Sequence, residues 1–309
     1  MTKTALLFAG QGAQSVGMGR ELAVHSEKAR DWFERANAAL GYDLAALCFE
    51  GPEAELMKTE HAQPGIFLVG WVALQALLDR APGLHYEAAA GLSLGEFTAL
   101  TAAGALSFED GLRVVRQRGL SMQEACEISQ GSMAAIIGLD EAATRAVCAE
   151  TGVALANLNC PGQIVISGPT DRLGPACELA KARGARKAIP LPVAGAYHSP
   201  LMASAQDPLR TALRAVTLAP ARVPVVSNVT AQPHGTGPEI EERLVEQVTA
   251  AVRWEDSMRY LLAQGFTRFI ELGPGTALTG FMRRIEKSAE ILNVADPASL
   301  EATVRVVGS

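Results

Sequence analysis

The sequence predicts an α/β protein with a large domain that is interrupted by a smaller one. Short apolar segments that end in glycines, Thr4–Ala9 and Glu87–Gly91, have the composition of buried strands, and helical patterns lie between them. From Met133 to Leu191 the pattern changes to strand, helix, strand, strand, helix, strand. The third observation is a G-x-S-x-G pentapeptide at 91–95, which stands between a strand pattern and a helix pattern.

The helices expected before residue 130 follow from periodicity and end signals. Arg20–Leu40 is predicted as one helix because Gly41 follows it as a C-terminal cap. Gln63–Arg80 is almost wholly apolar, which indicates a buried helix. A helix over Glu96–Ala103 follows the pentapeptide, and a capping pattern starts a long helix over 107–128.

The remaining elements divide the chain into two predicted domains. The smaller domain, 130–195, has strands at 133–137, 153–158, 163–167 and 186–191 and helices at 140–150 and 170–183. After this segment the alternation of strands and helices seen in the first part of the chain returns. It predicts helices at 200–216, 239–250, 255–264 and 276–287 and strands at 224–227, 268–272 and 291–294. Residues 1–129 and 196–309 are therefore expected to form one discontinuous large domain.

Composition limits the classes of function. The chain has 309 residues, of which 49% are hydrophobic and 19% charged, so it is expected to fold compactly and not to be disordered. Its formal charge is −6 and no cluster of Lys or Arg is present. Neither nucleic acid nor an anionic membrane is expected as a partner, which leaves a small molecule or another protein.

Targeting signals and cysteine chemistry are also not expected. The longest strongly apolar stretch, Ile66–Leu78, has 13 residues and is shorter than the roughly 20 that span a bilayer. The apolar segment after Lys3 is too short for a signal peptide, so the predicted location is the cytoplasm. The five cysteines include no C-x-x-C pair, which predicts free thiols and no metal site.

The pentapeptide Gly91-Leu92-Ser93-Leu94-Gly95 is the strongest chemical signal. Two glycines allow a turn so sharp that the Ser93 hydroxyl and the Leu94 N–H face the same space, as a nucleophile and an oxyanion donor must. A Gly-rich turn without chemistry is the alternative.

A nucleophilic serine needs a base, and the chain has five histidines. His25, His61, His85 and His234 are interpreted as surface or capping residues. His198 lies in a turn directly after the inserted domain, where the chain returns to the large domain, and is the best candidate base.

Two further segments are ambiguous on their residues alone. Gly10-Gln11-Gly12 lacks the third glycine of a dinucleotide-binding loop, because Ser15 stands there, but its backbone could supply a second oxyanion donor. Arg118 lies in a helix whose apolar face is formed by Leu112, Val115 and Gly119, so spacing alone makes it a solvated charge.

Six blocks together resemble the malonyl-CoA:acyl carrier protein transacylase family. In family order they are Phe8-Ala-Gly-Gln-Gly-Ala-Gln14, Gly91-Leu-Ser-Leu-Gly-Glu96, Gln117-Arg-Gly119, Asn159-Cys-Pro-Gly-Gln-Ile-Val-Ile-Ser-Gly168, Tyr197-His-Ser-Pro-Leu-Met202 and Glu271-Leu-Gly-Pro-Gly275. They cover nearly the whole chain. The resemblance implies a hydrolase-like large domain with a nucleophile elbow, a ferredoxin-like insertion, and a site in the cleft between them.

The resemblance also implies a role for each matching residue. Ser93 would be the nucleophile, His198 the general base and later acid, and the N–H groups of Gln11 and Leu94 the oxyanion hole. Arg118 would pair with the malonyl carboxylate, which a planar guanidinium suits. Gln63, Asn159 and Tyr197 would line the cleft, and the backbone carbonyl of Arg253, in place of an acidic residue, would orient the histidine.

Two positions depart from the family pattern or bear on selectivity. Leu92 stands where many relatives have histidine, which questions the support of the turn but leaves the nucleophile, base and oxyanion donors in place. Tyr197 stands where relatives that prefer malonyl often have phenylalanine. Its bulk is expected to exclude an α-methyl branch, so malonyl is expected over methylmalonyl.

The implied reaction is a two-step transfer from malonyl-CoA to the pantetheine thiol of acyl carrier protein in fatty acid synthesis, through a malonyl-serine ester. Coenzyme A thioester is a substrate, and no metal or redox cofactor is implied. Three alternatives stay open: a serine esterase or thioesterase, a non-catalytic subunit that docks a carrier protein, and a variant that serves polyketide synthesis or malonate decarboxylation.

Overall fold

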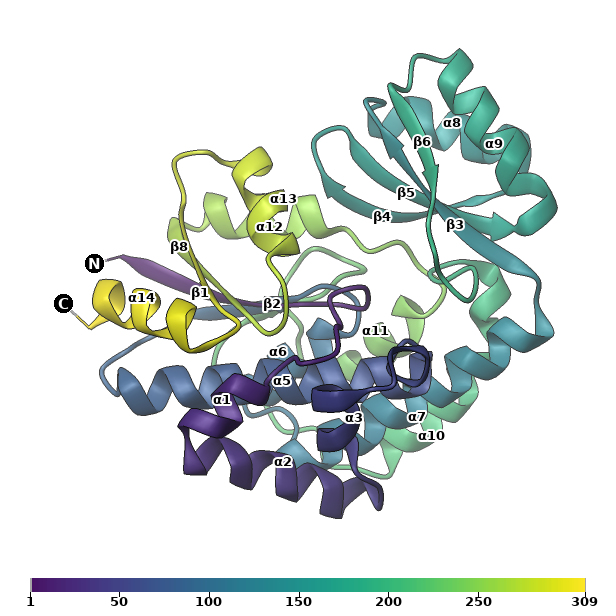
Figure 1. The fold of residues 1–309 in the computed structure, drawn as a ribbon. Helices are drawn as coiled ribbons and strands as arrows, with labels where there is room; N and C mark the ends of the chain where they lie inside the picture. The colour runs from purple at the N-terminus through teal and green to yellow at the C-terminus, as the bar shows by residue number, and fades with distance from the viewer. Residues whose placement is uncertain (1, 309) are drawn as a thin grey trace.

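The computed structural model describes residues 2–308, which form two β-sheets with helices packed on them (Figure 1). The larger sheet has the order β7-β2-β1-β8-β9, and all its strand pairs are parallel. Its strands are β1 (Lys3–Phe8), β2 (Ala88–Gly91), β7 (Val225–Val226), β8 (Phe266–Leu272) and β9 (Glu290–Val294). The parallel sheet expected from the buried apolar segments is therefore present.

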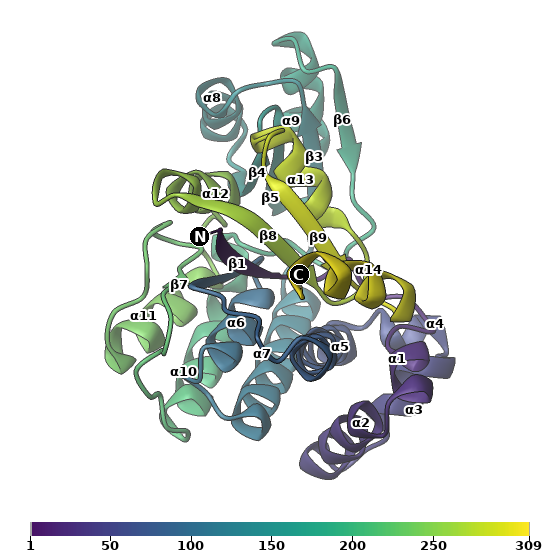
Figure 2. The same ribbon diagram turned by 90° about the vertical axis from the view of Figure 1, so that its left-hand side faces the viewer.

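Both faces of this sheet are covered, which explains why its strands are apolar throughout. Successive residues of β1 face opposite sides: Leu6 and Phe8 pack with the helices below the sheet, and Ala5 and Leu7 with those above it. Figure 2 shows the first layer as α5, α6 and α7 and the second as α12 and α13. These helices are α5 (Thr59–Arg80), α6 (Gly95–Ala102), α7 (Phe108–Ile128), α12 (Trp254–Ala263) and α13 (Ala277–Ile285).

The smaller sheet is antiparallel and lies at one end of the molecule, at the upper right of Figure 1. Its strand order is β4-β5-β3-β6, with two helices on one face. The elements are β3 (Gly131–Ile137), α8 (Glu141–Thr151), β4 (Ala154–Cys160), β5 (Gln163–Pro169), α9 (Thr170–Ala182) and β6 (Lys187–Pro190). The predicted order of strands and helices in this segment is observed, with ends that differ by a few residues.

Two predicted helices are each divided in the structure. The helix expected over Arg20–Leu40 is α1 (Arg20–His25) and α2 (Glu27–Leu40), because Ser26 is extended and its hydroxyl caps α2 by accepting from the Ala29 N–H. The helix expected at 200–216 begins as the 3₁₀-helix η1 (Pro200–Ala205) and continues as α10 (Gln206–Arg214).

Four helices complete the fold. They are α3 (Leu44–Glu50), α4 (Glu53–Leu56), α11 (Gly237–Gln247) and α14 (Pro297–Val307). The sequence predicts α11, at 239–250, but none of the other three. Helices α3 and α4 are too short to show a periodicity, whereas α14 begins at a capping box formed by Asp296 and Ser299.

Helix α5 is longer than predicted, because it begins at Thr59 and includes Pro64 near its start. By length and apolar composition alone this helix could cross a membrane, contrary to the expectation based on Ile66–Leu78. However, 72% of its apolar window is buried inside the protein, where the helix contacts α2, α6 and α7. It is the central core helix of the larger layer.

The turn from β2 into α6 depends on close backbone approach. A Cβ atom on Gly95 would lie 2.2 Å from the carbonyl oxygen of Phe8, and one on Gly91 would lie 1.9 Å from the carbonyl of Gly95. Gly10, after β1, packs equally closely on the carbonyl oxygen of Leu92. Only glycine fits at these three positions, so the end of β1 and the 91–95 turn are held in fixed contact.

Gly95→Ala is expected to lower the free energy of unfolding by about 3 kcal/mol, because backbone atoms cannot move away from the new methyl group. Urea denaturation of the purified variant measures this change. The matched control is Gly280→Ala in α13, where a Cβ atom meets nothing within 4 Å, and a gain of up to about 1 kcal/mol is expected there. Equal stability of the two variants would contradict the steric account of the turn.

Candidate active site

Ser93 lies at the tip of the turn between β2 and α6, with a backbone φ of +53°. A serine in this left-handed region is strained, and strain of this kind persists only where surrounding contacts hold it. The contacts come from Asn228, whose Oδ1 accepts from the Ser93 N–H at 2.6 Å and whose Nδ2 donates to the Gly91 carbonyl at 2.7 Å. Leu92 is not needed for this support, because Asn228 supplies it, and the Leu92 side chain lines the adjacent cavity.

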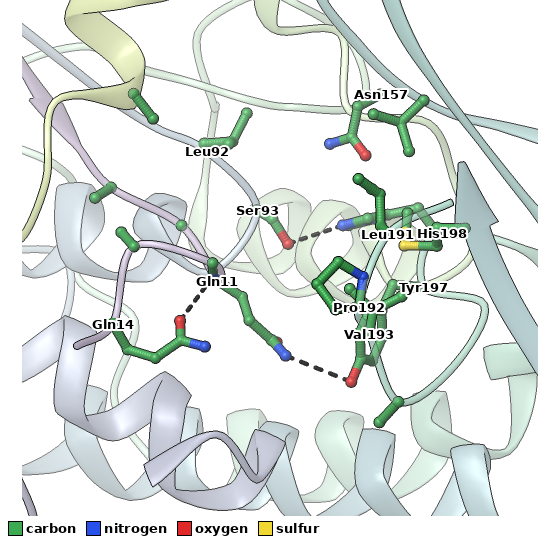
Figure 3. A pocket seen from close by; sticks show the side chains of 18 of the residues that line it. Gln11, Gln14, Leu92, Ser93, Asn157, Leu191, Pro192, Val193, Tyr197 and His198 are labelled. Carbon is green, nitrogen blue, oxygen red and sulfur yellow. Dashed lines mark hydrogen bonds between the residues drawn. The ribbon is translucent and has the colours of Figure 1, made fainter. Parts of the chain in front are cut away.

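The His198 ring faces the Ser93 hydroxyl, with Nε2 at 2.8 Å from Oγ (Figure 3). The opposite ring nitrogen, Nδ1, lies 2.9 Å from the backbone carbonyl oxygen of Gln247. Because a carbonyl only accepts, Nδ1 carries the proton and the lone pair of Nε2 points at the serine. Burial, together with the nearby charge of Arg118, lowers the pKa of His198 to about 4, so the ring is neutral at pH 7.

The expectation that Arg253 orients this histidine is wrong. The Arg253 carbonyl is the first acceptor of α12 and accepts from both the N–H of Ser257, at 3.0 Å, and its Oγ, at 2.8 Å, so both of its lone pairs are occupied. Gln247, in contrast, is the last residue of α11, where helical carbonyls lack intrahelical partners. The predicted kind of group, a backbone carbonyl in place of an acid, is present at a different residue.

Arg118 is buried beneath Ser93, with only 1% of its surface exposed. Its guanidinium donates to Ser93 Oγ at 3.0 Å and to the side-chain oxygens of Gln63 at 2.7 Å and Gln247 at 2.9 Å. Burial lowers the pKa of Arg118 to about 10, and the charge of Glu96 opposes that shift, so the group is a cation at pH 7. The solvated face inferred from spacing is wrong because α7 is covered by α5 on one side and by η1 and α10 on another.

Gln11 and Leu94 lie on the two turns that meet at this point. Within residues 2–308, neither backbone N–H makes a hydrogen bond, so both are free to donate to a ligand. The Gln11 side chain is held in place, because its Oε1 accepts from Gln63 at 3.3 Å and its Nε2 donates to the Tyr197 hydroxyl at 3.4 Å. Figure 3 shows Gln11 and Ser93 on the same side of the cavity.

The two other cleft candidates, Tyr197 and Asn159, also line this cavity, which has a volume of about 660 Å³. The Tyr197 hydroxyl lies 2.6 Å from Thr59 Oγ1, and burial raises the pKa of Tyr197 to about 12. Asn159 is 6% exposed, and its Oδ1 is a buried acceptor without a partner in the described part of the chain. Gln63 does not line the cavity but lies behind it against Arg118.

The walls of the cavity come from the smaller sheet, from α13 and from the turns that follow β1 and β2, including Gln11 and Leu92. The smaller sheet supplies Asn157, Asn159 and Val165, and α13 supplies Leu278 and Phe281. The cavity is therefore a largely apolar cleft, and the polar groups of Ser93 and His198 face each other in it (Figure 3). Sequence reasoning placed the site in a cleft of this kind.

Sequence reasoning missed a group of polar residues beneath the serine. Gln247, Asn228 and Glu96 are all fully buried. Glu96 ends one of the blocks that resemble the family but was assigned no role, and Gln247 and Asn228 carried no local signal of function. His234 was assigned to the surface, but its side chain is 1% exposed and its Nε2 lies 2.6 Å from Glu96 Oε1. Buried polar side chains of this kind form a hydrogen-bond network, and the network can be recognised only once the structure is known.

Between residues 2 and 308, no three His, Cys, Asp or Glu side chains are grouped so that they could hold a metal ion. The five cysteines are free thiols. The site combines a serine hydroxyl against a neutral imidazole, two free backbone N–H donors, and a buried cation. Enzymes that form an ester on a serine use groups of these kinds.

The fold and site thus define a serine acyltransferase, and comparison with known proteins identifies the family. Residues 5–305 match the acyl transferase domain family. The malonyl CoA-acyl carrier protein transacylase of Bacillus subtilis is 43% identical over 99% of this chain and 98% of its own length, and that of Escherichia coli K12 is 41% identical over 99% and 100%. The chain belongs to the malonyl CoA-acyl carrier protein transacylase family, as the resemblance indicated.

Solved structures agree with this assignment. The acyl-carrier-protein S-malonyltransferase of Bartonella henselae is 38% identical, with a TM-score of 0.95 over 99% of this chain and 100% of its own. A malonyl-transacylase solved in complex with an acyl carrier protein of a type II polyketide synthase is 36% identical, also with a TM-score of 0.95, over 99% and 100%.

Labelling of Ser93 by a fluorophosphonate is expected to depend on pH through His198. Because the pKa of His198 is lowered to about 4, the imidazole loses its proton as the pH rises through about 4. The labelling rate is therefore expected to rise near pH 4 and to stay constant from about pH 5 to 8. Pulse labelling followed by intact mass spectrometry measures the rate, with circular dichroism to verify folding at each pH. A midpoint near the ordinary histidine value of about 6.5 would contradict the buried, neutral imidazole.

Proposed function

We propose that this protein transfers the malonyl group from malonyl-CoA to the pantetheine thiol of acyl carrier protein, for fatty acid or polyketide synthesis. The observation that carries the proposal is the buried Arg118 guanidinium at 3.0 Å from Ser93 Oγ. A cation directly beside the nucleophile suits an acyl group that ends in a carboxylate. The names of the relatives from Bacillus subtilis and Escherichia coli, and the carrier-protein complex of the solved relative, support the same substrates.

The first half-reaction loads the enzyme. Ser93 Oγ attacks the thioester carbonyl carbon while its proton passes to His198 Nε2. The tetrahedral oxyanion is stabilised by the N–H groups of Gln11 and Leu94, and the loss of one such donor typically costs ~10²–10³ in rate. The carbon–sulfur bond then breaks, coenzyme A leaves with the proton from the imidazolium, and the malonyl ester of Ser93 remains.

The second half-reaction repeats these steps with a different nucleophile. The pantetheine thiol gives its proton to His198 and attacks the ester carbonyl, and the same two N–H groups hold the oxyanion. Ser93 leaves and recovers the proton. The Gln247 carbonyl keeps the ring in the required tautomer throughout, so no acidic residue has to orient it.

Arg118 and the cleft residues would set the choice of acyl group. The malonyl carboxylate would take the guanidinium donors that face Ser93, at the expense of the resting bond to Oγ. Tyr197 is fixed by Thr59 and narrows this region, which favours malonyl over a branched methylmalonyl group. Gln63 would hold the arginine, and Asn159 offers an unpaired acceptor to the substrate in the cavity.

Finer features of the fold belong to the same proposal. We infer that the 91–95 turn is a hydrolase-like nucleophile elbow, which the positive φ of Ser93 and the packing of Gly91 and Gly95 support. The order β4-β5-β3-β6 supports a ferredoxin-like unit over 130–195, inserted into a large domain of 1–129 and 196–309. A cytoplasmic location and a reaction without a cofactor stay predictions.

The direct test combines both half-reactions. The wild-type protein is incubated with malonyl-CoA and weighed intact, then desalted and mixed with acyl carrier protein that carries its pantetheine arm. A malonyl adduct that forms on the enzyme and moves to the carrier is the expected result, and Ser93→Ala is expected to gain no adduct because Oγ is absent. Loading of the Ser93→Ala variant, or loss of the adduct to water without transfer to the carrier, would overturn the proposal.

A further inference from the structure

Glu96 is a fully buried carboxylate beneath the nucleophile that the mechanism above does not use. It lies in the first turn of α6, three residues after Ser93, and three donors converge on it. Gln247 Nε2 lies 2.6 Å and the Asn228 backbone N–H 3.1 Å from its Oε2, and His234 Nε2 lies 2.6 Å from its Oε1. Because a carboxylate only accepts, all three partners must present hydrogens to it.

This acceptor fixes the orientation of the Gln247 amide. A glutamine amide can turn over and exchange its oxygen and nitrogen at little cost unless its neighbours distinguish them. Here the amide nitrogen donates to Glu96 Oε2 and, at 2.9 Å, to the Ser93 carbonyl. With both hydrogens occupied, the amide oxygen must face the other way, where it accepts from Arg118 at 2.9 Å.

Arg118 is held by two glutamines that are oriented in the same manner. Gln63 presents Oε1 to the guanidinium because its own nitrogen donates to Gln11 Oε1 at 3.3 Å. On the Gln63 side, the hydrogen bonds therefore lead to a neutral acceptor, Gln11 Oε1. On the Gln247 side, they lead to a charged and stronger acceptor, Glu96. The charge of Glu96 also opposes the effect of burial on the pKa of Arg118. Glu96 therefore acts on the arginine through geometry and through charge.

We propose that Glu96, held by His234, is a positioning residue that fixes the Gln247 amide and thereby presents the Arg118 guanidinium to an acyl group with a free carboxylate. The inference rests on the proposed function and adds a determinant of acyl selectivity to it. His234 is the only partner of Glu96 Oε1 in the described residues, and its imidazole is closed off from solvent. It makes no hydrogen bond to Ser93 and does not line the cavity, and its side chain is linked to the site through Glu96.

The test compares His234→Leu with His234→Gln. Glutamine can place an amide nitrogen near the position of the imidazole Nε2 and keep the donor, whereas leucine fills the space without one. We measure kcat/KM for malonyl-CoA and for acetyl-CoA, because only malonyl-CoA carries the carboxylate. His234→Leu is expected to lower the malonyl-to-acetyl ratio about tenfold, as for a lost hydrogen bond to a charged group, and His234→Gln to restore most of it.

Glu96→Met removes every acceptor and is expected to lower the ratio further than His234→Leu. If this variant does not fold, the pair at His234 still decides. Glu271→Gln is the matched control, because Glu271 is equally buried but accepts from the Leu278 and Thr279 N–H groups at the start of α13. It is expected to lower the melting temperature without a change in the ratio.

The outcomes separate the inference from the function on which it rests. If the wild type does not prefer malonyl-CoA to acetyl-CoA, the proposed function and the inference both fail. If the wild type shows the preference but His234→Leu and Glu96→Met slow both thioesters equally, Glu96 supports only the fold or the serine, and the inference alone is overturned. A selective loss of malonyl transfer that His234→Gln reverses supports it.

Discussion

The structure depends on keeping a charged guanidinium in a dry interior directly beneath a serine hydroxyl. Burial of an unpaired charge costs several kcal/mol in practice, so Arg118 can remain there only if acceptors and an opposite charge lie nearby. Its two terminal nitrogens have acceptors, whereas its Nε is buried without a partner in the described residues. Gln63, Gln247 and Ser93 accept from it, and Glu96 supplies the opposite charge. Under the proposed function, the guanidinium is thus in place before a substrate carboxylate arrives, which would limit the reorganisation on binding.

The residues around Arg118 also set the protonation of His198 and the backbone conformation of Ser93. Burial and, after it, the charge of Arg118 lower the pKa of His198, so the ring is a neutral acceptor, and the carbonyl of Gln247 fixes its tautomer. Gln247 is therefore the residue through which serine, histidine and arginine are linked, since its side chain also bonds the Ser93 carbonyl. Ser93 and His198 both have positive φ angles, and these contacts, with Asn228, hold the two strained residues in place.

Local features of the sequence predicted the parts of this site that depend on local conformation. The glycines around Ser93 define the turn by sterics, and His198 lies in a short turn that follows the last strand of the smaller sheet, so both could be identified from short segments. Buried partners could not: Ser93 and Gln247 are 154 residues apart, and Glu96 and His234 are 138 apart. Spacing alone placed Arg118 on a solvated face, which is wrong because helical spacing describes one apolar face and α7 is covered on more than one; the resemblance to the family, in contrast, had selected this residue for the site. The Arg253 prediction was wrong because it chose the carbonyl at the start of α12, which accepts from within its own helix. The carbonyl that faces His198 is that of Gln247 at the end of α11.

The central claim is that Arg118 recognises the carboxylate of the acyl group, and Arg118→Ala tests it most directly. We would measure kcat/KM of wild type and variant with malonyl-CoA and acetyl-CoA, and follow thermal unfolding in parallel. Loss of one side of a desolvated charge pair commonly costs ~2–5 kcal/mol, so malonyl transfer is expected to fall at least about thirtyfold while acetyl transfer stays level or rises. Equal losses for the two thioesters would show that Arg118 supports the fold and not the carboxylate, and would contradict the account.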